Sequence, residues 1–355
     1  MDPAGIKGLA QALLPWYRAH HRALPWRDDP DPYKVWVSEI MLQQTRIEAV
    51  RPYYQRFMQA LPDVAALAAA DTDTLYKLWE GLGYYSRVRH LHQAAVQIMQ
   101  AGGRMPDAYE QLLKLPGVGP YTAGAIASIA FGRRAAAVDG NVLRVLARLT
   151  GYEGDVLAPA GKKELSALAW ELLPQRDAGT YNQAIMELGE TVCLPGAAVR
   201  CGQCPAQALC EARRQGNAAA LPVRGARPPR RMEPYTVLIV LSGQRVLLHR
   251  RPEKGLLAGM WELPPLPGHL SAAQAAQALR QMGIPAQPVR ELPAARHLFT
   301  HVEWQMTGAL LRAAPFVPPD GFCLATARQL EEDFALPGAY KAYQRLIPAL
   351  LSDPA

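Results

Sequence analysis

The sequence predicts a multidomain protein in which an all-helical domain precedes a smaller α+β domain. Its 355 residues exceed the usual size of one hydrophobic core. Apolar residues recur at helical spacing in residues 1–220, whereas β-branched runs separated by turns occur in residues 234–350. The segment between them, 221–233, carries four arginines and three prolines and predicts an extended linker.

The composition favours a folded protein and excludes a disordered or fibrous one. Half of the residues are hydrophobic and 19% are charged. The 38 basic residues outnumber the 31 acidic ones, and the net charge of +7 suits a phosphate-rich partner without requiring one. No apolar run approaches the roughly 18 residues that a membrane span needs, and no secretory signal opens the chain. We therefore expect a cytoplasmic monomer with no membrane partner.

Short apolar patterns locate individual elements in each domain. In the first domain, the helices predicted from periodicity are Val64–Ala70, Leu75–Trp79 and Leu91–Met99. In the second domain, strands are predicted at Tyr235–Leu241, Val246–His249 and His301–Leu311, with a helix at Ser271–Met282. No β-rich run interrupts the first domain, so helices alone are expected there.

Residues 107–132 predict two helices joined by a tight turn. Asp107 precedes Glu110 by three residues, as in a capping box, and a short helix to Lys114 is expected to follow. The next segment, LPGVG, is unsuited to a helix. A second helix is predicted at Tyr121–Phe131, with Pro120 where it begins. Gly117 and Gly119 let the backbone approach another chain, and the free N–H groups of the second helix can hold a phosphate. A simple helix–helix turn is the alternative.

Two carboxylates are candidates for acid and electrostatic chemistry. Glu39 lies in a predicted helix among Trp36, Val37, Ile40 and Met41, and such neighbours raise the pKa of a carboxyl group and favour a general acid. Asp139 precedes a predicted helix as its N-cap, where backbone N–H groups are expected to keep it ionised. The alternatives are a surface glutamate and an ordinary N-cap, because the sequence gives no distance between them.

Four cysteines cluster at the end of the helical region and predict a metal site. They have the spacing C-x7-C-x2-C-x5-C, and they are Cys193, Cys201, Cys204 and Cys210. An iron–sulfur cluster tolerates uneven spacing, whereas zinc sites usually show two close pairs. Zinc remains the alternative, and the isolated Cys323 is interpreted as a core residue.

Several motifs together resemble one family of DNA repair enzymes. LPGVGPYTAGAIAS (115–128) and VDGNVLRVLAR (138–148) resemble the helix–hairpin–helix and following loop of the DNA glycosylase superfamily that includes endonuclease III. VWVSEIMLQQT (35–45), GLGYYSR (81–87) and the cysteine cluster resemble MutY-type adenine DNA glycosylases. The motifs follow the family's order over essentially the whole chain.

The resemblance implies a monofunctional glycosylase that excises adenine opposite 8-oxoguanine or guanine in double-stranded DNA. It implies that Glu39 protonates the adenine, that Asp139 stabilises the oxocarbenium ion, and that Asn141 orients Asp139. Tyr121 packs at the sugar, where bifunctional relatives carry a lysine that forms a Schiff base. The resemblance also implies a structural 4Fe–4S cluster, although the first cysteine gap is one residue longer here. A protein of this kind associates with the nucleoid through DNA.

The resemblance also assigns residues to DNA recognition. Gln43, Gln44 and Thr45 carry groups that can read base edges, and the last two are expected to contact the base opposite the adenine. The other assignments are Tyr84 with Leu82 as the wedge that fills the vacated stack, and Trp26 with Arg27 as the lining of the adenine pocket. The alternative for Tyr84 is a core aromatic beside a turn.

The second domain resembles a Nudix fold through RRPEKGLLAGMWELPPL (250–266) and RQMGI (280–284). The corresponding helix has no Asp or Glu, so metal-dependent pyrophosphohydrolase activity is not expected. The resemblance implies an 8-oxoguanine-recognition loop at 297–301, which includes Phe299, Thr300 and His301. Thr300 stands where the family commonly has serine, and a strand edge with a buried Phe is the alternative.

Two other functions remain open at this stage. One is an endonuclease III-like pyrimidine glycosylase, which Tyr121 and the second domain disfavour. The other is a non-catalytic DNA-binding module, which the pair Glu39 and Asp139 disfavours.

Overall fold

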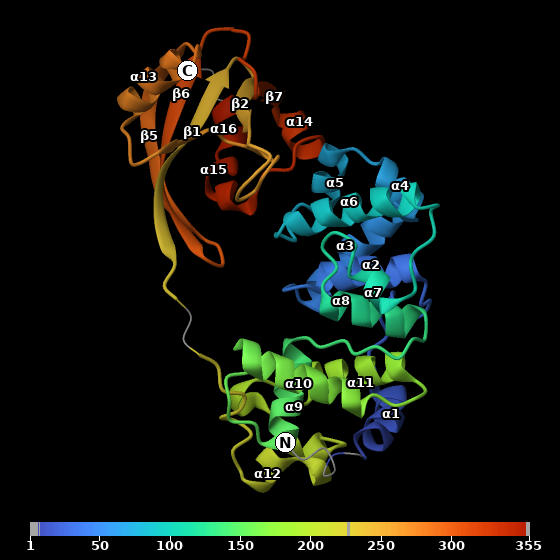
Figure 1. Cartoon of the computed structure of the whole chain (residues 1–355). Helices are drawn as coiled ribbons and strands as arrows, with labels where there is room; N and C mark the ends of the chain where they lie inside the picture. The colour runs from blue at the N-terminus through green and yellow to red at the C-terminus, as the bar shows by residue number, and fades with distance from the viewer. Residues whose placement is uncertain (1–5, 7, 226–227, 353–355) are drawn as a thin grey trace. The chain divides into compact units, whose positions relative to one another are not determined.

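The computed structural model describes residues 6, 8–225 and 228–352 and divides them into two compact units (Figure 1). The first unit combines residues up to 69 with residues 90–225. The second combines residues 70–89 with residues from 228 onwards. Residues 70–89, expected in the helical domain, therefore group with the second unit.

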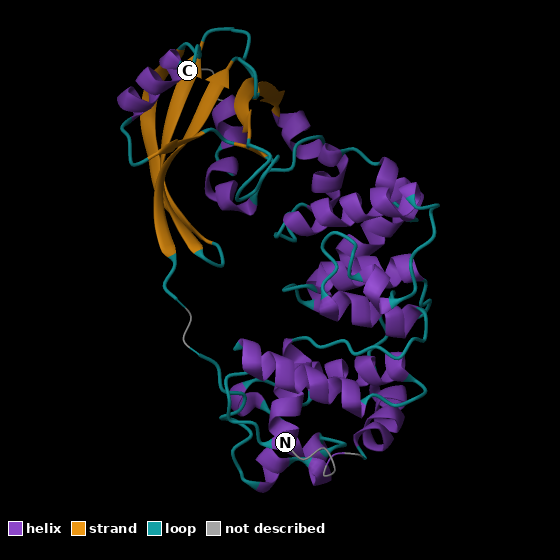
Figure 2. Ribbon diagram, viewed as in Figure 1, coloured by secondary structure: helices purple, strands orange, loops and turns teal. Residues whose placement is uncertain are grey.

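The first unit has helices and no strand among its described residues, as the sequence predicts (Figure 2). Its α-helices are α1 (Leu9–His20), α2 (Pro32–Leu42), α3 (Ile47–Ala60), α4 (Val64–Ala69), α6 (Ser86–Gln100, which begins in the second unit), α7 (Tyr109–Leu112), α8 (Pro120–Ala125), α9 (Gly140–Thr150), α10 (Pro159–Leu172), α11 (Ala178–Thr191) and α12 (Glu211–Arg214). A π-helical turn covers Ile126–Ala130, and short 3-10 turns cover Gly196–Ala198, Cys201–Gln203 and Gln207–Leu209.

A core formed by α1, α9, α10 and α11 fixes two of the elements that line the candidate site. Leu13, Leu146, Leu165 and Ala184 are completely buried in it. Because α9 and α11 pack directly on one another, the position of the start of α9 relative to α11 is fixed by close packing.

Helix α2 carries Glu39 and is strongly fixed at its start. The Asp31 side chain caps it by accepting hydrogen bonds from the N–H groups of Tyr33 and Lys34. Pro32 occupies the first turn, where its missing N–H costs nothing. Trp36, Val37 and Met41 on this helix are completely buried.

The two-helix segment forms as predicted, with corrections at three points. The capping box at Asp107 is wrong, because Ala108 is the N-cap of α7 and Asp107 instead pairs with Arg133. Helix α7 ends at Leu112 rather than at Lys114. The second helix is α8 followed by a π-helical turn rather than one α-helix to Phe131. Gly117 has the positive φ of +74° that the tight turn requires.

The second unit is built on one sheet with the strand order β3-β2-β1-β6-β5, where β4 also pairs with β1 and β7 with β2. Strands β1 and β6 run parallel and the other pairs are antiparallel. The strands are β1 (Arg231–Ser242), β2 (Arg245–Arg250), β3 (Trp261–Glu262), β4 (Pro265–Pro267), β5 (Ala286–Leu298), β6 (Val302–Ala313) and β7 (Phe322–Thr326). The helices are α5 (Thr72–Trp79), α13 (Ala272–Gln281), α14 (Ala327–Glu332), α15 (Lys341–Gln344) and α16 (Ile347–Ser352), with a 3-10 turn at Gly338–Tyr340.

Both faces of this sheet are covered, as the unbroken apolar run of β1 requires (Figure 2). Val237 and Ile239 belong to a core with residues of α15 and α16. Leu238 and Val240, on the opposite face, belong to a core with α13. Strand β1 begins at Arg231, inside the segment predicted as linker, and β5 has no counterpart among the predicted strands.

Replacing Gly124 with alanine should destabilise the first unit. A Cβ added at this position would overlap the carbonyl oxygen of Ala136, so α8 or its neighbour must shift. We expect Gly124→Ala to lower the free energy of unfolding by about 1–3 kcal/mol in denaturant titration. Gly140→Ala is the control, because a methyl group there meets open space, and equal stability of the two variants would contradict the prediction.

Candidate active site

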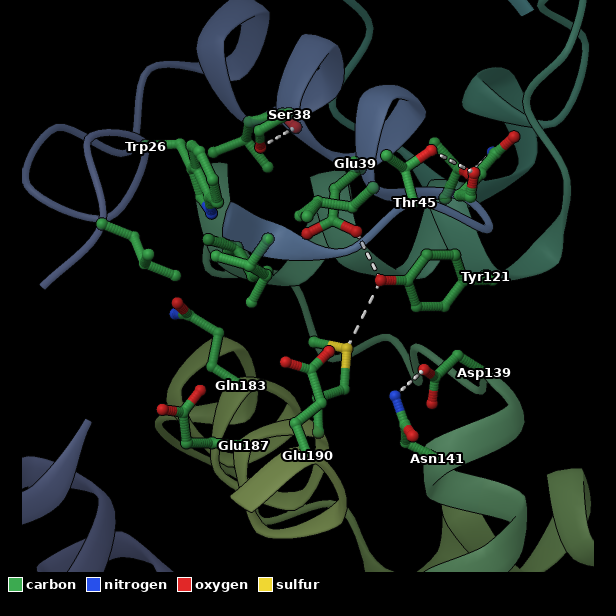
Figure 3. Close-up of a pocket in the computed structure, with 18 of the residues that line it drawn as sticks. Trp26, Ser38, Glu39, Thr45, Tyr121, Asp139, Asn141, Gln183, Glu187 and Glu190 are labelled. Atoms are coloured by element: carbon green, nitrogen blue, oxygen red, sulfur yellow. Dashed lines mark hydrogen bonds between the residues drawn. The ribbon is translucent and has the colours of Figure 1, made fainter. Parts of the chain in front are cut away.

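A pocket in the first unit collects most of the predicted site residues (Figure 3). It lies between α2, the turn after it, the start of α8, the start of α9 and one face of α11. The predicted residues that line it are Trp26, Arg27, Glu39, Gln43, Gln44, Thr45, Gly117, Gly119, Tyr121, Asp139 and Asn141. Residues 100 positions apart in the chain thus share one cavity.

Glu39 is buried in this pocket and is 6% exposed. The Tyr121 hydroxyl donates a hydrogen bond to its Oε2, and Met186 Sδ lies 3.4 Å from the same hydroxyl oxygen. Burial raises the pKa of Glu39 to about 7, although the Tyr121 hydrogen bond acts in the opposite direction. The carboxyl group therefore carries a proton in a large fraction of molecules near neutral pH.

Tyr121 remains a neutral hydroxyl donor in this setting. It comes from the first turn of α8, immediately after the glycine-containing turn. Burial and the neighbouring carboxylates Glu39 and Asp139 raise its pKa well above its usual range. A phenol that keeps its proton can orient Glu39 through a hydrogen bond and adds no second negative charge beside it.

Asp139 caps α9, as the sequence predicts. Its Oδ1 accepts from the Val142 N–H at 2.7 Å, and its Oδ2 accepts from Asn141 Nδ2 at 2.8 Å. That these donors keep Asp139 ionised stays a prediction. Burial raises the pKa of Asp139, and the two hydrogen bonds offset that rise only in part.

A chain of hydrogen bonds connects Asp139 with the cysteine-containing loop. Asn141, which holds Asp139, accepts through Oδ1 from Arg144 Nη2 at 2.9 Å. Arg144 Nε donates to the carbonyl oxygen of Cys193 at 2.8 Å, and Nη2 donates to that of Gly189 at 2.8 Å. Since Arg144 is 4% exposed, the loop and the carboxylate are tied through a buried cation.

The four predicted metal-ligating cysteines line one small cavity beside α9, and all four are free. Arg148 Nη1 donates to the Sγ of Cys193 at 3.3 Å and to the carbonyl oxygen of Leu194 at 2.7 Å. As they stand, no three His, Cys, Asp or Glu residues within the described ranges are arranged to hold a metal ion. Four soft sulfur donors around one cavity nevertheless fit the chemistry of an iron–sulfur or zinc site.

Helix α11 supplies site residues that sequence reasoning missed. Gln183, Glu187 and Glu190 line the pocket and, at spacings of four and three residues, lie on one helix face. Glu187 is 1% exposed and binds Arg22 Nε at 2.7 Å and Arg27 Nη2 at 2.8 Å. Burial alone would raise the pKa of Glu187, but the two arginines lower it to about 2. The helical spacing of these polar residues was the available signal.

The expected wedge and recognition loop lie in the second unit. Tyr84 is 46% exposed, has a positive φ of +50°, and its hydroxyl lies 3.1 Å from Thr300 Oγ1. Leu82 is buried. Phe299 is half-buried and packs edge-on against Trp304, with ring centroids 4.9 Å apart. The structure thus brings Tyr84 and Thr300 together.

Comparisons with known proteins agree on one family. Residues 37–175 match the HhH-GPD superfamily of base excision DNA repair proteins, and residues 236–345 match the NUDIX domain. The adenine DNA glycosylase of Mus musculus is 37% identical over 88% of this chain and 73% of its own length. That of Homo sapiens is 36% identical over 90% of this chain and 70% of its own length.

Solved structures support the fold of the first unit. A thermostable thymine-DNA glycosylase is 28% identical, with a TM-score of 0.55 over 60% of this chain and 98% of that one. A trapped endonuclease III–DNA intermediate is 22% identical, with a TM-score of 0.52 over 61% of this chain and 99% of that one, and shows the fold alone.

In the part of the chain that the structure describes, every helix is too short or too polar to cross a membrane.

The ion pairs of Glu187 should make stability depend on pH in the acid range. Its pKa of about 2 in the folded protein lies below the ordinary value of 4.5. The resulting stabilisation, about 3 kcal/mol, is present above pH ~4.5 and is lost as the pH falls towards 2. Urea titrations should show a flatter dependence for Glu187→Gln than for Glu171→Gln, which changes an exposed carboxylate. Parallel curves would contradict the assignment.

Proposed function

The chain belongs to the adenine DNA glycosylase family of base excision repair enzymes, and from that premise we propose how its pocket works. It is a hydrolase of N-glycosidic bonds that acts on DNA. The proposed substrate is adenine opposite 8-oxoguanine, or opposite guanine, in double-stranded DNA. The observation that supports the mechanism best is the common pocket of Glu39, Tyr121 and Asp139.

In the proposed mechanism Glu39 is the general acid. A base inside a duplex is out of reach, so the adenine first leaves the stack and enters the pocket beside Trp26 and Arg27. Glu39, with its pKa raised to about 7, donates its proton to N7 of the adenine. The electrons of the C1′–N9 bond then leave with a neutral base, which makes the bond easier to break. The resulting Glu39 carboxylate can take a proton from the water that attacks C1′.

Asp139 is proposed to stabilise the cationic sugar. Bond cleavage leaves positive charge on C1′ and the ring oxygen, and a carboxylate fixed by two donors faces it without reorganisation. Asp139 acts through its charge or through a transient ester at C1′. Water then adds at C1′, so that the products are free adenine and an abasic sugar in an intact strand.

Tyr121 supports a monofunctional reaction. Strand cleavage of the endonuclease III kind uses an amine that forms a Schiff base with the opened sugar. A hydroxyl that stays bonded to Glu39 has no such chemistry. This residue therefore favours adenine excision over the alternative of a bifunctional pyrimidine glycosylase.

Recognition of the opposite base is proposed to involve both units. Gln44, which has a positive φ of +58°, and Thr45 both line the pocket, and their polar groups are proposed to read a base edge. Gly117 and Gly119 offer backbone to a phosphate. In the second unit, Tyr84 and Thr300 are proposed to contact the 8-oxoguanine. Helix α13 contains no Asp or Glu, which disfavours Nudix-type phosphate hydrolysis.

A 4Fe–4S cluster is proposed at Cys193, Cys201, Cys204 and Cys210, with zinc as the alternative. Four sulfur donors line one cavity there. When bound, the cluster supplies a structural anchor and no redox step in base removal. The loop that it anchors holds Arg144 through the Cys193 carbonyl, and Arg144 in turn holds Asn141.

Single-turnover cleavage of a duplex with adenine opposite 8-oxoguanine tests the catalytic assignment. We expect adenine release with strand breaks only after alkali, and a rate that falls above pH ~7 as Glu39 loses its proton. Glu39→Gln should bind the duplex and be slower by about 10²–10⁴-fold. Breaks without alkali would refute the monofunctional assignment, and a rate that is flat to pH 9 would remove Glu39 from the acid role.

Elemental analysis of protein purified without oxygen tests the proposed cofactor. We expect about four iron atoms and four sulfides per chain, and a loss of both in Cys204→Ser. One zinc atom per chain would establish the alternative. Cys323→Ser is the matched control, because Cys323 lies in the second unit and should leave the metal content unchanged.

A further inference from the structure

Helix α11 brings into the pocket a carboxylate, Glu190, that the mechanism above does not use. Glu190 lines the cavity together with Glu39 and Asp139. Figure 3 shows it on α11 between Glu187 and Asp139, on the side of the helix that faces the pocket. Its side chain is 36% exposed, so water and substrate can reach it.

One oxygen of Glu190 is held and the other is available. Arg22 Nη2 donates to Oε2 at 2.5 Å and is itself anchored by Glu187, to which it donates at 2.9 Å. Among the described residues, no hydrogen bond reaches Oε1 of Glu190. Glu187 differs, because both of its oxygens are occupied by Arg22 and Arg27. Glu190 therefore keeps a free acceptor at the edge of the cavity.

We propose that Glu190 is an auxiliary carboxylate of the excision site, which Arg22 holds in place and which adds negative charge beside Asp139 and Glu39. The proposal rests on the function proposed above. Positive charge develops on the sugar when the glycosidic bond breaks, and a second fixed anion next to Asp139 lowers the energy of that state. Glu190 acts through this charge and need not touch the breaking bond.

The charged and titratable groups around the site support this role. The charged and titratable groups that line this cavity with Glu190 are Arg22 and Arg27 before α2, Glu39 on α2, Arg46 and Glu48 at the start of α3, Tyr121 on α8, Asp139 at the start of α9 and Glu187 on α11. The charge of Glu190 contributes to raising the pKa of Glu39 and that of Asp139, in each case after the larger effect of burial. It thereby favours the protonated form of the general acid.

Removal of this charge predicts a distinctive pH profile. In Glu190→Gln, the pKa values of Glu39 and Asp139 should both fall, because an influence that raises each of them is gone. The alkaline and acid limbs of the single-turnover rate should therefore both move to lower pH, by about half a unit. The rate at the optimum should fall by about fivefold to tenfold. A variant with purely structural damage would lose rate without moving either limb.

The experiment compares single-turnover rates from pH 5 to 9.5 on the duplex with adenine opposite 8-oxoguanine. Glu190→Asp keeps the charge and should retain the limbs of the parent protein. Glu190→Ala is the second neutral variant if Glu190→Gln folds poorly, since alanine favours a helix. Glu171→Gln, on the exposed face of α10, is the control and should match the parent in rate and profile.

Two outcomes would overturn the proposal. One is a neutral variant with the rate and limbs of the parent, and the other is a lower rate with unmoved limbs. Failure of the underlying function gives a different result, namely a Glu39→Gln variant that releases adenine as fast as the parent. If the parent lacked an alkaline limb, the acid limb alone would decide. A fivefold loss of rate with the acid limb of Glu190→Gln moved to lower pH would support the role of Glu190, and an unmoved acid limb would overturn it.

Discussion

The pocket depends on a contrast between two buried carboxyl groups. The charge of Glu187 is balanced by two arginines, whereas Glu39 forms no such ion pair in the described part of the chain. Glu187 is enclosed between Arg22 and Arg27, and its pKa falls to about 2. Glu39 is almost as deeply buried, but within the described residues its carboxyl group has only the Tyr121 hydroxyl as a hydrogen-bond partner, and its pKa rises to about 7. Burial raises the pKa of both carboxyl groups. The placement of the two guanidinium groups therefore decides which of the two can act as an acid.

This contrast explains the arrangement of the surrounding helices. Arg22 and Arg27 precede α2, whereas Glu187 belongs to α11, so their ion pairs join segments that are 160–165 residues apart. The same α11 packs on α1 and α9, and α9 begins at Asp139. These ion pairs thus hold the walls of the pocket together, and both guanidinium groups donate hydrogen bonds to Glu187.

Sequence patterns predicted the parts of the site that are locally encoded. The apolar neighbours of Glu39 predict its burial, and an Asp before a helix predicts the cap at Asp139, whereas the catalytic roles of both residues come from the family resemblance. Arg22, Glu187 and Glu190 were missed because their partners are distant in sequence, and no local rule pairs an arginine with a particular glutamate. Asp107 was misinterpreted because the capping-box spacing is common, whereas its actual partner Arg133 comes from the far end of the hairpin. Strand β5 was missed because it pairs only with β6 and is largely exposed, which leaves its sequence polar.

The proposed substrate explains why the proposed catalytic residues and the proposed mispair-recognition residues are different residues. Adenine is a normal base, so a pocket that recognises it has no means of separating a mispaired adenine from one paired with thymine. Discrimination therefore has to come from the cost of flipping and from contacts with the opposite base. Tyr84, exposed in an unfavourable backbone conformation, and Thr300, which lies beside it in the second unit, are the residues proposed for such contacts. In this proposal the chemistry of Glu39 and Asp139 need not depend on the mispair, because the opposite base is recognised by other residues.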